Sequence, residues 1–299
     1  MRKILFLGAS SQITKSFINH DFDKKICKKN IKVLSFRKFN TFEELINKFK
    51  PDIIVNTFVY HPVDLCEKNK LKSYQGNVLL IKKIINTIKK SKVINPLLIH
   101  FSSDYVYSSF NKNYLCNEYD SLKPVNVLGM HKAMAEKYLV KNYKNHLIFR
   151  ISWLFSLYNN NFVKTMLHVF KKNKIVKVIN NQYGNPTSTS LISKVLLKLF
   201  HKYSIKTTNG IFNLCSTPNV SWFDFAKEIK KNIKGKVDNI NILPISSFDY
   251  NKLSNVKTKR PYNSSMSISK VQSHFKIRKK DFDWREDLKE IINSLSHFN

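Results

Sequence analysis

The first half of the chain alternates short apolar runs with amphipathic segments. Five apolar runs have the length of buried strands and cover residues 3–8, 31–36, 52–56, 97–102 and 146–152. Segments with apolar residues at helical spacing lie between them, at 12–20, 41–49 and 71–90. Thr41 and Glu44 have the spacing of a capping box for the second of these helices. Strands separated by helices predict an α/β fold with a doubly wound parallel sheet, and its ligand should lie at the carboxyl ends of the strands.

The second half is less regular. Helical patterns cover 161–172, 188–203 and 283–295, and another helix opens at 221–224 with Ser221 as its N-cap. Short strands are predicted at 176–179, 211–214 and 240–243, and the polar segment 244–261 is predicted to be a loop that shapes a pocket. No linker is evident between the two halves, so we expect them to pack around one cleft.

Composition excludes several classes of protein. The net charge of +32 comes from lysines spread over the whole chain, in regions that are also rich in Asn and Ile. This spread favours compositional drift of surface residues over a specific nucleic-acid-binding surface. No run of about 18 uncharged apolar residues occurs, so we expect no membrane span and a cytoplasmic location. The histidines have no ligand-like spacing, which argues against a metal site. The cysteines are far apart in the sequence and are expected to be free thiols: Cys27, Cys66, Cys116 and Cys215.

The turn after the first strand has the spacing of a dinucleotide-binding turn. In its G-x-x-G-x-x-G pattern the three glycine positions hold Gly8, Ser11 and Thr14, so one glycine remains. The hydroxyl groups of Ser10 and Ser11, with backbone N–H groups at a helix N-terminus, can still hold a phosphate. Arg37 follows the second strand, at the position where an acidic residue would hold the ribose of NAD. Its guanidinium suits the extra phosphate of NADP; compositional drift towards basic residues explains Arg37 equally well.

The candidate chemistry lies after the fourth strand and in the helix that follows. Ser103 and Asp104 end the strand at 97–102, and Lys132 lies in the first turns of the helix after Asn126. A short-chain reductase needs a tyrosine four residues before that lysine. This position holds Leu128, whose alkyl side chain cannot donate a proton.

Several segments together resemble one family. They are PDIIVN (51–56), HFSSDYVY (100–107), PVNVLG (124–129), HLIFRISW (146–153), NFVKTML (161–167), VINNQYGNPT (178–187) and RPYNS (260–264). In this order they resemble dTDP-4-dehydrorhamnose reductase, of the extended short-chain dehydrogenase/reductase class, over nearly the whole chain. The resemblance implies a Rossmann-type core in residues 1–155, to which the chain returns around residues 186–215. It also implies that residues 156–299 form a smaller α/β portion that mainly binds substrate.

The resemblance also implies a reaction and a set of site residues. The reaction is transfer of hydride from NADPH, or alternatively NADH, to the C4 ketone of dTDP-4-dehydro-L-rhamnose, which gives dTDP-L-rhamnose. The catalytic positions are Ser103, Asp104 and Lys132. The cofactor positions are Gly8, Ser10, Ser11, Gln12, Ile13, Arg37, Val59, Tyr60, His61, Ser102 and Lys132. The substrate positions are Ser103, Trp153, Arg260 and Asn263. A dTDP-sugar is the expected small-molecule partner, and a homodimer is left open.

The missing tyrosine leaves two interpretations. In the first, the chain is a weak reductase, and the proton comes from water held by Ser103 and Lys132 or from Tyr60, Tyr105 or Tyr107. In the second, it is a catalytically inactive subunit that binds the nucleotide-sugar and NADP and serves a regulatory or partner role. A basic RNA-associated protein is a third, minor reading.

Overall fold

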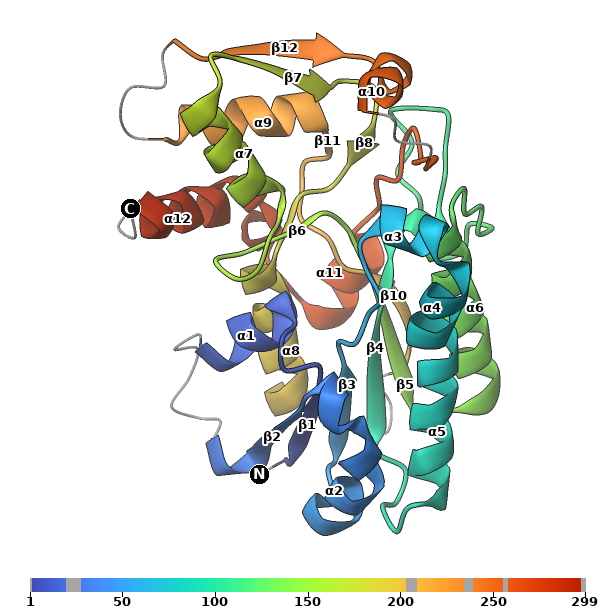
Figure 1. Cartoon of the computed structure of the whole chain (residues 1–299). Helices are drawn as coiled ribbons and strands as arrows, with labels where there is room; N and C mark the ends of the chain where they lie inside the picture. Colours follow the sequence, from blue (N-terminus) through green and yellow to red (C-terminus); the bar gives the residue numbers. More distant parts are fainter. Residues whose placement is uncertain (1, 20–27, 203–208, 234–238, 255–257, 297–299) are drawn as a thin grey trace.

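A six-stranded parallel sheet forms the centre of the computed structural model, which describes residues 2–19, 28–202, 209–233, 239–254 and 258–296 (Figure 1). Its order is β2-β1-β3-β4-β5-β10, and every neighbouring pair is parallel. The strands are β1 (Ile4–Leu7), β2 (Ile31–Leu34), β3 (Ile53–Asn56), β4 (Leu97–Ser103), β5 (His146–Ile151) and β10 (Gly210–Asn213). The predicted α/β fold with a doubly wound parallel sheet is confirmed.

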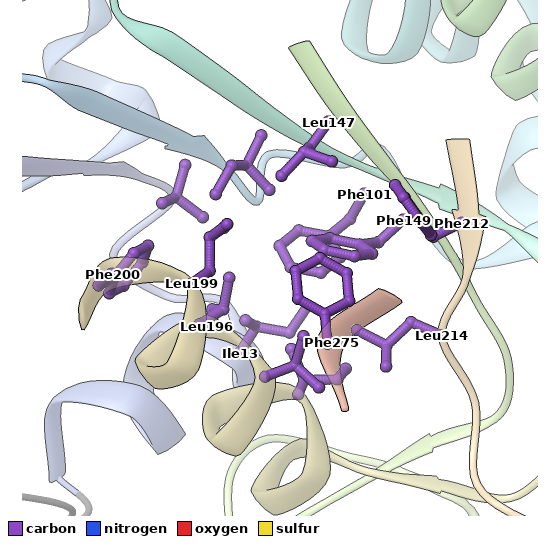
Figure 2. Packing of buried hydrophobic residues seen from close by; sticks show 14 of the residues in the cluster. Ile13, Phe101, Leu147, Phe149, Leu196, Leu199, Phe200, Phe212, Leu214 and Phe275 are labelled. Carbon is purple, nitrogen blue, oxygen red and sulfur yellow. The ribbon is translucent and has the colours of Figure 1, made fainter. Parts of the chain in front are cut away.

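Helices cover both faces of the sheet because each presents an apolar side to it. One face is packed by α1 (Gln12–Asn19), α8 (Thr189–Lys202) and α11 (Ser269–Phe275). Figure 2 shows this packing, with Ile13, Leu196 and Phe275 meeting Phe101 and Phe149 of the sheet. The other face is packed by α2 (Phe42–Phe49), α5 (Leu80–Lys90) and α6 (Val127–Asn142).

A smaller portion lies beyond the end of the sheet at which α3 (Val63–Lys68) begins (Figure 1). Its parallel pair, β7 (Ile175–Ile179) and β12 (Asn241–Ile245), packs with α7 (Phe162–Lys172), α9 (Trp222–Lys231) and α12 (Trp284–Ser296) around an apolar cluster of its own. Short pairs connect the two portions: β6 (Leu154–Phe155) with β9 (Thr187–Ser188), and β8 (Tyr183–Gly184) with β11 (Val220–Ser221). The domain limits at 155 and 156 stay a prediction.

Three local predictions are wrong or incomplete. The proposed capping box fails because the Thr41 hydroxyl donates to the Lys38 carbonyl instead of capping α2. The segment 244–261 is not a loop throughout: it contains the end of β12 and α10 (Ser247–Ser254), and residues 255–257 lie outside the described part. The helix predicted at 71–90 is divided into α4 (Lys70–Tyr74), a π-helical turn (Gln75–Leu79) and α5. In contrast, Ser221 caps α9 as predicted, because its hydroxyl accepts the N–H of Asp224.

Short helical turns complete the chain. These are 3₁₀ turns at Lys28–Asn30, Phe36–Thr41, Asp104–Val106 and Lys279–Phe282. The turn at Asp104–Val106 follows β4 directly and therefore positions the residues predicted to be catalytic.

Candidate active site

The turn after β1 lies at the switch point of the sheet, where the chain moves from β2 on one side of β1 to β3 on the other. Gly8 has φ +116°, a conformation that side chains rarely adopt. A Cβ at this position would overlap the Thr57 hydroxyl and approach the Phe58 backbone nitrogen at 3.3 Å. Position 8 therefore requires glycine, and the chain leaves the strand as a dinucleotide-binding turn does.

The lost glycine at position 14 is replaced by a hydrogen-bonded hydroxyl. Thr14 is buried, and its hydroxyl oxygen lies 2.9 Å from that of Thr57. Thr57 in turn donates to the Leu7 carbonyl at 2.8 Å. The substitution thus links α1 to the end of β3 without leaving an unsatisfied polar atom.

The other predicted cofactor residues of this turn lie together around the N-terminus of α1. The Ser11 hydroxyl accepts the N–H of Ile13 at 3.2 Å, whereas the Ile13 side chain is buried in the core. Gln12 accepts from the Ser156 hydroxyl at 2.7 Å. The Ser10 carbonyl accepts from the Asn159 amide at 2.6 Å, so the segment that follows β6 packs against this turn.

Two further groups of predicted cofactor residues follow β2 and β3. Arg37 is exposed in the 3₁₀ turn after β2. Val59 and His61 are exposed after β3, and Tyr60 is held between them by Asn77, whose side chain accepts its N–H and donates to its carbonyl, each at 3.2 Å. These residues therefore follow the carboxyl ends of the two strands that flank β1 in the sheet.

Ser103 and Asp104 form the centre of a hydroxyl cluster at the end of β4. Ser103 Oγ donates to Asp104 Oδ1 at 2.9 Å and accepts the N–H of Tyr105 at 3.1 Å. The other carboxyl oxygen of Asp104 accepts from Ser152 at 3.1 Å and from Ser264 at 2.7 Å. Burial raises the pKa of Asp104 to about 6, and these hydrogen bonds oppose the rise.

Lys132 reaches this strand from α6. Its side chain is buried, and Nζ donates to the Phe101 carbonyl at 2.8 Å. Burial lowers the pKa of Lys132 to about 8, and the charge of Glu136 acts in the opposite direction. Ser102 lies beside this carbonyl in the strand; its hydroxyl is buried and has no hydrogen-bond partner among the described residues.

Leu128 fills the tyrosine position with a buried apolar side chain. It packs with Val63, Cys66 and Val127, and the partly buried rings of Tyr60 and Tyr105 lie against this cluster. Tyr107 points elsewhere, because its hydroxyl donates to the Asn117 carbonyl at 2.8 Å and to Asn213 at 3.1 Å.

The three remaining predicted substrate residues have different surroundings. Trp153 has φ +40° and stacks on Trp222, with ring centroids 3.4 Å apart. Arg260 Nη2 donates to both carboxyl oxygens of Asp64, at 2.8 and 3.0 Å. Asn263 is fully buried, and its amide donates to two backbone carbonyls, so its contacts favour a structural role over direct contact with substrate.

Sequence reasoning missed Thr57, Asp64, Ser152 and Ser264. Two of them carried a usable signal: Thr57 follows β3 and Ser152 follows β5, just as Ser103 ends β4. Asp64 and Ser264 could not be found this way, because their partners lie far away in the sequence.

Three further features concern the described residues only. They contain no cluster of His, Cys, Asp and Glu that could hold a metal ion. None of their helices is both long enough and apolar enough to cross a membrane. Cys66, Cys116 and Cys215 are buried free thiols, and Cys27 lies outside the described part.

Comparison with known proteins agrees with this geometry. The family model "RmlD substrate binding domain" matches residues 1–297. The dTDP-4-dehydrorhamnose reductase of Aggregatibacter actinomycetemcomitans is 31% identical over 299 residues, which cover 97% of this chain and 98% of the relative. A dTDP-4-dehydrorhamnose reductase ortholog from Clostridium acetobutylicum has a crystal structure that matches with a TM-score of 0.83 at 25% identity, covering 98% of this chain and 99% of that one. The enzyme from Bacillus anthracis, in complex with NADP, matches with a TM-score of 0.82 at 23% identity and the same coverage. This chain belongs to the dTDP-4-dehydrorhamnose reductase family.

Proposed function

We propose that this chain is an NADPH-dependent reductase that converts the C4 ketone of dTDP-4-dehydro-L-rhamnose to the alcohol of dTDP-L-rhamnose. The observation that carries the proposal is that the buried Lys132 of α6 bonds the Phe101 carbonyl of β4, two residues before Ser103 at the carboxyl end of that strand. Strand β4 belongs to the sheet whose switch point contains the Gly8 turn. A ligand at the carboxyl edge of such a sheet can reach the turn and the hydroxyl together.

The residues around the Gly8 turn fit a dinucleotide. The glycine that opens the turn and the N-terminus of α1 suit a diphosphate. The exposed guanidinium of Arg37 suits a 2′-phosphate, which favours NADP(H), with NAD(H) as the alternative. When bound, the cofactor supplies the hydride that reduces the ketone carbon.

The chain's own residues bind and orient the sugar. The Ser103 hydroxyl is placed to hydrogen-bond the ketone oxygen, and Trp153 offers a flat ring held by its stacking on Trp222. Lys132 contributes a buried cation directed at the end of β4, where it suits the ribose hydroxyls of the cofactor. General acid catalysis contributes about 10²–10⁴-fold to such reactions, so Leu128 predicts slow turnover rather than none.

The second candidate function is an inactive subunit that binds NADP and the nucleotide-sugar. The buried Leu128 side chain is the observation that favours it. An assay of purified protein with NADPH and dTDP-4-dehydrorhamnose, beside an NADPH titration, separates the two. Binding with slow NADPH oxidation supports the reductase. Binding of both ligands without oxidation supports the inactive subunit, and a chain that does not bind NADPH contradicts the proposal.

The proposal includes a cytoplasmic location and no specific nucleic-acid partner. The charge of +32 still predicts weak, salt-dependent binding to nucleic acids without sequence preference. A homodimer is also proposed, and light scattering of the purified protein tests it: the mass of a single chain would contradict it.

A further inference from the structure

Asp104 is a buried carboxyl group without a cationic partner. Its residue is 3% exposed, and it forms no ion pair in the described part of the chain. The titratable groups that face it are Tyr105 from the same turn, Cys116 from the loop that follows, and Cys215 from the segment after β10. Burial raises the pKa of all three above their ordinary values, so all three are neutral near pH 7.

A carboxylate in such surroundings is stabilised by hydroxyl groups and by its own backbone N–H. Ser103, Ser152 and Ser264 donate to it at 2.7–3.1 Å. A hydroxyl can donate to an ionised carboxylate or accept from a protonated carboxylic acid. The same cluster therefore accommodates both states of Asp104, and burial raises its pKa to about 6, close to the working range of a general acid.

The two states differ in what Ser103 can offer a substrate. When Asp104 is ionised, the Ser103 hydrogen points at Asp104 Oδ1 and is not available to a ketone. When Asp104 is protonated, its O–H can donate to Ser103 Oγ, which also accepts the N–H of Tyr105. Both lone pairs of Ser103 Oγ are then used, and its hydrogen is free to donate.

We propose that Asp104 supplies the proton for the ketone oxygen through the Ser103 hydroxyl, in place of the phenol that is missing at position 128. This inference rests on the proposed reductase function. As hydride reduces the ketone carbon, the Ser103 O–H bond breaks and the new alcohol O–H bond forms. The Asp104 O–H bond breaks at the same time, and its proton re-forms the Ser103 hydroxyl. Asp104 is left as the carboxylate and regains a proton from water.

The relay predicts a specific pH dependence. The proton source must be protonated, so kcat is highest below the pKa of Asp104, near 6, and falls about tenfold for each pH unit above it. Donation by water or by a tyrosine with a raised pKa gives no such fall between pH 6 and 7, because Lys132, with a pKa of about 8, titrates only above this range. The infrared absorption of a protonated carboxyl group, recorded without ligands and compared with that of Asp104→Asn, follows the proton on Asp104 independently of activity.

Substitutions test the route itself. Asp104→Asn keeps the size of the side chain but removes its acidic proton, and we expect kcat to fall about 10²-fold or more with little change in KM. Tyr105→Phe is the matched control, because it removes the buried phenol of the residue next to Asp104, and we expect kcat within threefold of wild type. Adding Leu128→Tyr to Asp104→Asn should restore turnover, which the loss of a purely structural group would not allow.

Each outcome decides the inference. A fall in kcat for Asp104→Asn, rescue by Leu128→Tyr and the decline above pH 6 together support it. Turnover of Asp104→Asn equal to wild type, or an equal loss in Tyr105→Phe, overturns the relay and leaves the reductase function standing. If the wild type binds both ligands and does not oxidise NADPH, the proposed function and the relay both fail, whatever the infrared titration shows.

Discussion

Replacing Leu128 with tyrosine should convert this chain into a faster reductase. Leu128 lies one helical turn before Lys132, and both side chains are buried, with Leu128 packed against Val63 and Cys66 of α3. A phenol at 128 would extend from this helix towards the end of β4, where Lys132 is bonded to the Phe101 carbonyl. With a pKa of about 8, Lys132 is protonated in roughly nine of ten molecules at pH 7. Its charge would lower the pKa of the phenol and favour proton donation.

The structure predicts two opposing effects of Leu128→Tyr, a loss of stability and a gain in turnover. Leu128 is 4% exposed among Val63, Cys66 and Val127, so the larger ring must displace neighbours, at a cost of about 1–3 kcal/mol in the free energy of unfolding. In a chain of this size, each kcal/mol lowers Tm by about 2–4 °C. A restored general acid raises kcat by about 10²–10⁴-fold, or roughly 2.7–5.5 kcal/mol of activation free energy. The first effect acts on unfolding and the second on turnover, so they can be measured separately.

The assay compares Leu128→Tyr with Leu128→Phe. Both variants carry a ring, and they differ by one hydroxyl group. We expect similar losses in Tm, with an increase in kcat for dTDP-4-dehydrorhamnose in the tyrosine variant alone. If Leu128→Tyr is folded, binds NADPH and turns over no faster than wild type, the absence of an acid at 128 is not what limits this chain.

Three other substitutions test the remaining parts of the site. Gly8→Ala places a Cβ against Thr57 in a left-handed conformation, and we expect about 1–3 kcal/mol of destabilisation in thermal unfolding together with weaker NADPH binding. Arg37→Ala should raise the Kd for NADPH about tenfold or more and leave the Kd for NADH nearly unchanged, whereas equal effects on both would remove Arg37 from the phosphate contacts. Lys132→Met should abolish most turnover, while urea unfolding shows equal or greater stability, because an apolar side chain of similar size replaces a buried cation.

The parts of the site that follow strand ends could be predicted from the sequence. Gly8, Ser103 and Trp153 each come directly after a short apolar run, and parallel strands bring such positions to one edge of a sheet. The position of Lys132 follows from the start of α6, which Asn126 caps by accepting the N–H of Gly129. In these places local pattern and fold agree, so the elements that carry the predicted site residues were found with small errors in their bounds.

The parts that depend on contacts between distant segments could not be predicted. The carboxyl group of Asp104 is held by Ser264, which lies 160 residues away. Arg260 pairs with Asp64 across 196 residues. Spacing carries no information about such pairs, because only the folded chain brings them together.

Local patterns are also insufficient where the side chain concerned forms its hydrogen bonds with another element of the fold. Thr41 and Glu44 have the spacing of a capping box, but Thr41 belongs to the preceding 3₁₀ turn, and its hydroxyl is used there. Asn263 stays a predicted substrate residue, although its amide hydrogens already bond the carbonyls of Asn111 and Tyr114. A matching residue type therefore does not establish a matching contact.

The buried charges help to separate the two candidate functions. A reductase carries out its chemistry at the buried site, whereas a partner subunit also acts through its surface. A partner subunit that binds NADP can use Lys132 for the cofactor ribose but has no need of a titratable acid at Asp104 inside the protein, where an unpaired charge costs several kcal/mol on desolvation. Apolar residues of similar volume would make the same fold more stable. Asp104 instead accepts from the Ser103 hydroxyl at the end of β4, and Lys132 bonds the Phe101 carbonyl of the same strand, where a ligand of the sheet would bind. A gain in stability with a loss of turnover in Lys132→Met would show that this cost serves a ligand, whereas a loss of stability would show that Lys132 supports the fold.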